Sequence, residues 1–142
     1  MKKIVLFLSF FISFSSCEKD AGEGGTSVIE GQVYKIHTFQ NASTGAMDTL
    51  YYQLDSGKDV FIIYSDNETE VYDDKFETDY NGRYHFEYLR KGDYTLYTYA
   101  DSTVDISSTI ELKYEYPIFK HIKINSNNSD NSVEDFVIEK NQ

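Results

Sequence analysis

The residues with the clearest chemical potential lie in one acidic stretch, from Asp55 to Asp79. This stretch holds nine acidic residues against two lysines. Calcium takes about six to eight oxygen ligands from carboxylates, amides and carbonyls. Five side chains are candidate ligands: Asp66, Asn67, Asp73, Asp74 and Asp79. Because their spacing does not match an EF-hand loop, two interpretations stay open, a calcium site and a solvated acidic loop that protects sheet edges.

The remaining polar residues do not favour catalysis. The three histidines, His37, His85 and His121, fall in separate expected strands, and no Ser, His and Asp residues have the spacing of a triad. With 24 acidic and 13 basic residues the formal net charge is -11, so a nucleic-acid partner would be repelled. One cysteine is too few for an internal disulfide or a zinc cluster. We expect no enzyme, no cofactor and no disulfide-linked partner.

Tyrosine offers a different chemistry. The chain has 13 tyrosines and no tryptophan, and exposed tyrosine rings can stack on sugars or peptides. The candidates for such contacts are Tyr51, Tyr52, Tyr97, Tyr99, Tyr114 and Tyr116. Because tyrosine is also a strong strand former, a structural interpretation of these residues stays open.

The N-terminus has the pattern of an export signal. Lys2 and Lys3 precede an apolar run of eleven residues, 4–14, which is the length of a signal-peptide core rather than of a membrane span. The following Ser15, Ser16 and Cys17 resemble a relaxed lipobox. This resemblance implies cleavage before Cys17 and its acylation, palmitate included, which would anchor the protein almost irreversibly. Cleavage removes two lysines and leaves a net charge of 11 - 24 = -13.

The residues after the cysteine predict a location and a tether. Glu18, Lys19 and Asp20 resemble the export signals of surface lipoproteins, so we expect an outer-membrane protein exposed at the cell surface. Residues 21–27 contain three glycines and no large apolar side chain, which is typical of a flexible tether. We therefore expect a signal peptide at 1–16, the acylated cysteine and tether at 17–27, and a folded domain at 28–142.

Two short triplets suggest a modification. Asp48-Thr49-Leu50 and Asp101-Ser102-Thr103 resemble the sites of a bacterial O-glycosylation system. The resemblance implies glycans on Thr49 and Ser102.

The folded part consists of short segments rich in β-branched and aromatic residues, with no helical period. A short connection at 90–93 predicts that strands 83–89 and 94–100 form a hairpin. Pro117 is expected at a strand start or edge, and the polar segment 125–132 as a loop. The expected strands are 28–39, 49–54, 59–65, 83–89, 94–100, 105–113, 118–124 and 133–139. Seven or eight strands predict an all-β, antiparallel β-sandwich.

One stretch carries a family resemblance. From Thr78 to Leu96 the chain reads T-D-x-N-G-x-Y-x-F-x-x-L-x-x-G-x-Y-x-L, which is similar to carboxypeptidase regulatory-like and Cna B-type domains with a transthyretin-like (prealbumin-like) sandwich. The fold-defining residues are Asn81, Gly82, Tyr84, Phe86, Leu89, Gly92 and Tyr94. We expect positive φ angles at Asn81 and Gly82, core positions for Tyr84 and Phe86, and a corner carbonyl capped by the Tyr94 hydroxyl.

The resemblance implies a scaffold rather than an activity. The hydrolases of the transthyretin-like superfamily end in Tyr-Arg-Gly-Ser, whereas this chain ends in residues 139–142, Glu-Lys-Asn-Gln. An isopeptide bond of the Cna B type would need the loosely placed trio Lys35, Glu87 and Asn141, so we expect Lys35 to face solvent. Two functions stay open: an accessory module that binds a glycan or peptide, and a structural subunit that docks onto an envelope protein.

Overall fold

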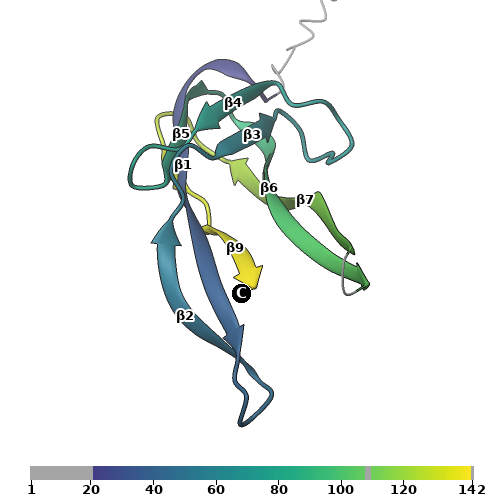
Figure 1. Cartoon of the computed structure of the whole chain (residues 1–142). Helices are drawn as coiled ribbons and strands as arrows, with labels where there is room; N and C mark the ends of the chain where they lie inside the picture. The colour runs from purple at the N-terminus through teal and green to yellow at the C-terminus, as the bar shows by residue number, and fades with distance from the viewer. Residues whose placement is uncertain (1–20, 108–109, 142) are drawn as a thin grey trace, which may run out of the picture.

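The computed structural model describes residues 21–107 and 110–141 (Figure 1). This described part is all-β, with nine strands in two sheets, and it contains no helix that could cross a membrane. The strands are β1 (Glu23–Gln40), β2 (Met47–Leu54), β3 (Asp59–Ile63), β4 (Asp74–Glu77), β5 (Arg83–Leu89), β6 (Gly92–Ser107), β7 (Ile110–Ile124), β8 (Asp130–Ser132) and β9 (Phe136–Asn141). The expected all-β sandwich is confirmed. Two strands were not expected, β4 inside the acidic stretch and β8 inside the polar segment 125–132 that was expected as a loop, whereas the three strands expected at 94–100, 105–113 and 118–124 form only two, β6 and β7.

The two sheets are built around two long strands. In the five-stranded sheet, β1 pairs with β2, β5, β8 and β9, and the four-stranded sheet has the order β4-β3-β6-β7. The sheets are mostly antiparallel, as expected; the exceptions are β8 and β9, which run parallel to β1. The segment after β7 carries the chain from one sheet to the other, which lets β8 and β9 lie along β1 in its own direction.

The core lies between the two sheets and follows the period-2 alternation of the strands. Its fully buried members come from both sheets: Ile29, Val33, Val60, Ile62, Tyr84, Leu89, Tyr94, Leu96, Ala100, Ile124 and Phe136. As expected, β3 is a central strand, because it lies between β4 and β6. Within the family-like pattern, Tyr84 and Phe86 are buried in this core.

The expected hairpin of 83–89 and 94–100 is wrong, because β5 and β6 belong to different sheets. The connection turns a corner between the sheets, with φ angles of 60° at Tyr88 and 151° at Gly92. Tyr94 Oη donates to the Arg90 carbonyl at 2.7 Å, the type of corner contact expected for Tyr94. A connection of this length can form either a hairpin or a corner between two sheets. Here it forms a corner, so β5 and β6 direct their apolar side chains into the core from different sheets.

A second turn also differs from expectation. Between β4 and β5 only Gly82 has a positive φ, of 69°, so the expected positive φ at Asn81 is wrong. Asp79 shapes this turn instead, because its Oδ1 accepts hydrogen bonds from the backbone N–H groups of Asn81 (2.8 Å) and Arg83 (2.9 Å).

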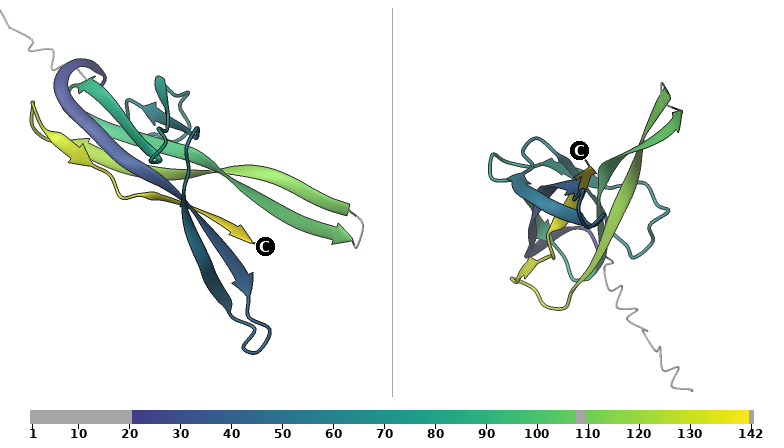
Figure 2. Two further views of the ribbon diagram at one scale, coloured as in Figure 1. Left: turned by 60° about the vertical axis from the view of Figure 1, so that its left-hand side comes forward. Right: turned by 60° about the horizontal axis from the view of Figure 1, so that its bottom comes forward.

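Strands β6 and β7 form one long hairpin in place of the three short strands expected at 94–100, 105–113 and 118–124. Pairing runs from Gly92↔Ile124 to Ser107↔Ile110. Pro117 lies inside β7, which is an edge strand, where a missing N–H is tolerated. This hairpin and the β1–β2 hairpin form two arms that extend away from the end of the molecule where the described chain begins (Figures 1 and 2).

Residues 21–27, which we call the N-terminal strap, are ordered rather than part of a flexible tether. Strand β1 already starts at Glu23. A Cβ atom on Gly25 would lie 1.9 Å from the Leu89 carbonyl oxygen, so this glycine permits close backbone packing. The glycine-rich composition that predicts flexibility also suits a strap pressed against its neighbour.

Candidate functional site

The outer surface of the four-stranded sheet carries a row of aromatic rings. Phe61, Tyr97 and Phe119 lie directly opposite one another on β3, β6 and β7. The ring centroids of Phe61 and Tyr97 are 4.9 Å apart, and those of Tyr97 and Phe119 are 5.3 Å apart. Because the residues on either side of Phe61 and Tyr97 are buried, alternation places this row on the opposite side of the sheet from the core.

Two further rings extend the row into solvent. Tyr99 lies 5.9 Å from Phe61 and 5.7 Å from Tyr97, and Tyr72 lies 4.9 Å from Phe61, measured between centroids. Tyr97 is only 8% exposed, whereas Tyr72 is 44% and Tyr99 is 36% exposed. We call these five residues the tyrosine face. The buried ring of Tyr97 and the half-buried rings of Phe61 and Phe119 thus support two rings that are open to a ligand.

Hydrogen bonds fix the loop that delivers Tyr72. Asp73 accepts a bond from the Tyr64 N–H through Oδ2 at 2.7 Å, and its own N–H donates to the Ile62 carbonyl at 2.9 Å. Thr95 Oγ1 donates to the Ser65 carbonyl at 2.8 Å. The loop between β3 and β4 is therefore tied to the sheet at both of its ends.

Polar groups surround the tyrosine face. Burial raises the pKa of Tyr97, and the neighbouring Tyr99 and Tyr72 raise it further. The Lys75 to Asp59 ion pair (3.1 Å) borders the rings on one side, and this hydrogen bond raises the pKa of Lys75.

The far end of the face is acidic. Beyond the row of Tyr99 and Pro117, Asp101 lies directly opposite Glu115 on the neighbouring strand. Like charges in such positions repel each other, and they would also repel an anionic ligand. The chemistry of this surface is therefore that of an aromatic binding site for uncharged or cationic groups.

The candidate calcium ligands do not meet in one cluster. Asp73 holds the loop as described, Asp74 accepts a bond from the Lys75 N–H (2.8 Å), and Asp79 shapes the β4–β5 turn. Asn67 Oδ1 accepts a bond from the Thr69 N–H at 3.1 Å. Among the described residues no group of three or more His, Cys, Asp or Glu residues is arranged to hold a metal.

The six candidate tyrosines separate into three places. Tyr97 and Tyr99 join the tyrosine face, Tyr51 and Tyr52 lie on β2, and Tyr114 and Tyr116 lie 6.2 Å apart on β7. On the β1–β2 arm, Tyr51 stacks on His37 at 4.2 Å. The sequence interpretation missed Phe61, Tyr72 and Phe119, although Phe61 and Phe119 alternate with inward-facing residues and were detectable in principle.

The remaining sequence candidates lie apart. Lys35 was expected to face solvent without a partner, but its Nζ contacts Oδ1 of the buried Asp55 at 2.6 Å. Glu87 lies beside His85, at 3.7 Å. Lys35 and Glu87, two members of the isopeptide trio, therefore have other partners. Thr49 is an exposed residue of β2, and Ser102 lies on β6. Cys17 and the expected signal peptide lie outside the described residues.

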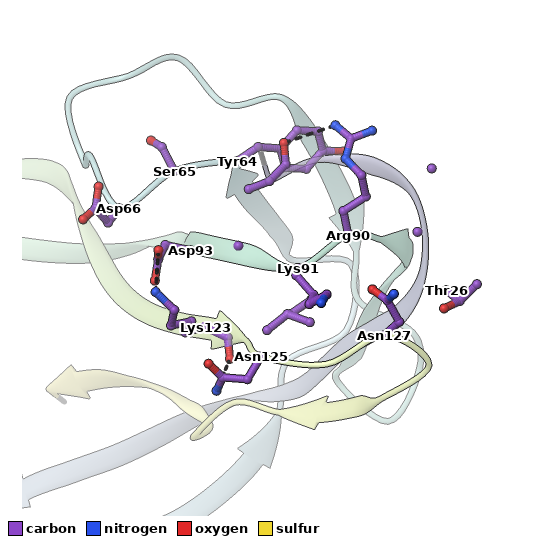
Figure 3. A pocket seen from close by; sticks show the side chains of 15 residues that line it. Thr26, Tyr64, Ser65, Asp66, Arg90, Lys91, Asp93, Lys123, Asn125 and Asn127 are labelled. Carbon is purple, nitrogen blue, oxygen red and sulfur yellow. Dashed lines mark hydrogen bonds and ion pairs between the residues drawn. The ribbon is translucent and has the colours of Figure 1, made fainter. Parts of the chain in front are cut away.

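An open pocket of about 1060 Å³ lies at the end of the molecule where the described chain begins (Figure 3). The N-terminal strap, the start of the β3–β4 loop and the ends of β6 and β7 surround it. Its charged lining side chains are Asp66, Arg90, Lys91, Asp93 and Lys123. Lys123 forms an ion pair with Asp93 at 3.0 Å. The pocket is polar and shallow, and its residues do not form a catalytic arrangement.

Comparison with solved structures finds similar chains. A solved structure of a protein from Pseudomonas aeruginosa, provisionally described as a carbohydrate-binding protein, is similar over 84% of this chain and 92% of its own, with 18% sequence identity and a TM-score of 0.49. A likeness at this level does not transfer a function. No family model and no curated protein matches the chain, so the resemblance to carboxypeptidase regulatory-like and Cna B-type domains stays a prediction.

Proposed function

We propose that this protein is a non-catalytic binding module whose tyrosine face binds an uncharged glycan. The observation that carries the proposal is a connected set of five aromatic rings on the outer surface of one sheet, each in contact with at least one other, and two of them substantially exposed. Aromatic faces pack against the C–H groups of sugars, and nearby hydroxyls exchange hydrogen bonds with sugar hydroxyls. The acidic end of the face disfavours acidic polysaccharides.

The proposed binding is weak for a single site. Only Tyr72 and Tyr99 offer large exposed ring areas, and each ring contact contributes on the order of 1 kcal/mol. The two rings together contribute about 2 kcal/mol, and hydrogen bonds from nearby hydroxyls add to this, so we expect dissociation constants in the millimolar range or weaker. Multivalent display on a membrane would raise the effective affinity.

The test compares ring variants with a matched control. Soluble protein starting after Cys17 is screened on arrays of neutral and acidic glycans, and hits are titrated by NMR. Tyr72→Ala and Tyr99→Ala should each weaken binding several-fold, and the double variant should abolish it. Tyr80→Ala is the control, because Tyr80 is 84% exposed but takes no part in the face. Equal binding by the double variant and the control would refute the proposal.

We also propose that acylation of Cys17 holds the module at the outer membrane, exposed at the cell surface. The support is the sequence around Cys17, an apolar run followed by small residues, the cysteine and a charged segment. Labelled palmitate should enter the wild-type protein but not Cys17→Ser, and Cys17→Ser should leave the membrane fraction. Protease added to intact cells tests the surface exposure.

A second candidate function, docking onto another protein, is supported by a different observation. On the outer side of the five-stranded sheet, Tyr34 pairs with Leu54 and Val137, and Ile36 pairs with Tyr52. Tyr52 is 67%, Leu54 40% and Val137 42% exposed. An exposed apolar patch of this kind favours contact with another protein. Crosslinking in native cells should then capture a partner that is lost in Tyr52→Glu, with Tyr80→Glu as the control.

A further inference from the structure

The N-terminal strap lies close in sequence to the proposed anchor at Cys17. Ala21 is the first described residue, four positions after Cys17. Four residues span at most about 14 Å when fully extended. The flexible tether expected from the sequence, which runs from Cys17 to Ser27, could span more than twice that length. The ordering of the N-terminal strap therefore limits how far the domain can stand from a membrane that holds Cys17.

The strap is tied down, so it cannot serve as extra tether. The Gly22 N–H donates to Tyr94 Oη at 2.9 Å, and the Arg90 N–H donates to the Gly22 carbonyl at 2.8 Å. The Arg90 guanidinium also donates to the carbonyls of Ala21 and Glu23. These bonds hold both ends of the strap's first turn on the corner between β5 and β6.

The surface around the strap is suited to contact with lipid headgroups. We call it the strap face; its polar members include Thr26, Arg90, Lys91, Lys123, Asn125 and Asn127. In a chain with a net charge of -11, it gathers three cationic side chains with two acidic ones. None of its residues is among the exposed large apolar residues of the described chain. Such a surface can rest on polar headgroups but offers nothing to insert into the acyl chains.

We propose that the strap face lies against the headgroups of the membrane that holds Cys17, so that both hairpin arms project away from it. This inference rests on the anchor in the proposed function. Strand β1 has 18 residues, and a strand of that length extends up to about 60 Å. The tips of the arms are therefore presented well above the bilayer, at the end opposite the strap (Figure 2).

The test locates two surface positions relative to the bilayer. Acylated full-length protein is reconstituted into vesicles of phosphatidylcholine and phosphatidylglycerol, with a single new cysteine labelled by a fluorophore. Asn127→Cys marks the strap face, and Ser43→Cys marks the tip of the β1–β2 arm; both residues are exposed. Lipids with a quencher on the headgroup should quench the Asn127 label several-fold more than the Ser43 label.

A lengthened tether provides the matched control. Inserting 20 Gly and Ser residues between Asp20 and Ala21 gives a linker of about 25 Å root-mean-square length, and it should reduce quenching at Asn127 to near the Ser43 value. Equal quenching at the two positions, in protein that floats with the vesicles, overturns the orientation alone. Protein that does not float overturns the anchor and the orientation together, while glycan binding by the soluble protein is unaffected.

Discussion

Replacing Tyr94 by Phe tests the corner that joins the two sheets to the N-terminal strap. The Tyr94 hydroxyl donates to the Arg90 carbonyl at 2.7 Å and accepts a bond from the Gly22 N–H at 2.9 Å. The ring is fully buried, so Phe can keep its packing. The variant loses two hydrogen bonds at about 1 kcal/mol each, and a buried N–H left without a partner adds to the cost. We expect the free energy of unfolding to fall by about 2 to 3 kcal/mol.

Urea unfolding of the soluble protein, followed by tyrosine fluorescence and far-UV circular dichroism, measures this change. The midpoint should fall while the slope stays constant, because the folded surface is preserved. Amide hydrogen exchange should accelerate at Gly22 and Arg90 before the core strands respond. Tyr80→Phe is the control and should change stability by less than about 0.5 kcal/mol. A Tyr94→Phe variant as stable as this control would refute the role assigned to the corner.

Three further predictions concern burial, metal and modification. Tyr84 Oη is buried with no hydrogen-bond partner among the described residues, so Tyr84→Phe should be neutral or stabilise by up to about 1 kcal/mol in urea unfolding. Burial raises the pKa of Tyr84. The contribution of its neutral side chain to the free energy of unfolding is fully present below the ordinary tyrosine pKa of about 10, and this contribution is lost as the pH rises above that value. Tyr84→Phe should therefore reduce the loss of stability between pH 9 and pH 11, values set around that pKa; an unchanged loss would contradict this. Calcium added to EDTA-treated protein should leave the melting temperature unchanged, since no metal-ligating cluster of described residues is assembled; a rise that saturates with calcium would restore the calcium interpretation. Intact-mass analysis of protein from native cells should show glycan on Thr49 and Ser102 that is lost in Thr49→Ala and Ser102→Ala, and an acylated polypeptide without added sugar would remove this proposal.

The sequence predicts the local elements well because alternation is a local property. The core positions of β3 and β5, such as Val60, Ile62 and Tyr84, follow directly from period 2. The pairing of the strands does not follow from this alternation, because a short connection can form a hairpin as well as a corner between sheets. The Tyr94 contacts, which favour the corner, involve Gly22, a residue 72 positions away.

For the candidate site, too, local sequence patterns predict some features and not others. Tyr97 and Tyr99 are recognisable as candidates because they alternate with the inward-facing residues of one strand and so share its outer side. Their contacts with Phe61 and Tyr72 depend on the pairing of β3 with β6 and on the path of the β3–β4 loop, which no local pattern reveals. The glycine-rich strap is ambiguous for a related reason, since glycine suits both a mobile tether and the closest backbone packing.

Packing that stabilises the fold does not explain every residue of the tyrosine face. The inward residues of β3, β6 and β7 already fill the core, and the row of Phe61, Tyr97 and Phe119 adds cross-strand packing on the outer surface. Tyr97 is almost completely covered within that row, so its ring is explained by packing. Tyr72 and Tyr99 keep more than a third of their surface in solvent and gain the least from burial. Their exposed area, supported by the row of Phe61, Tyr97 and Phe119 and bordered by the Lys75 to Asp59 ion pair, is the part of the surface that the proposed ligand would cover.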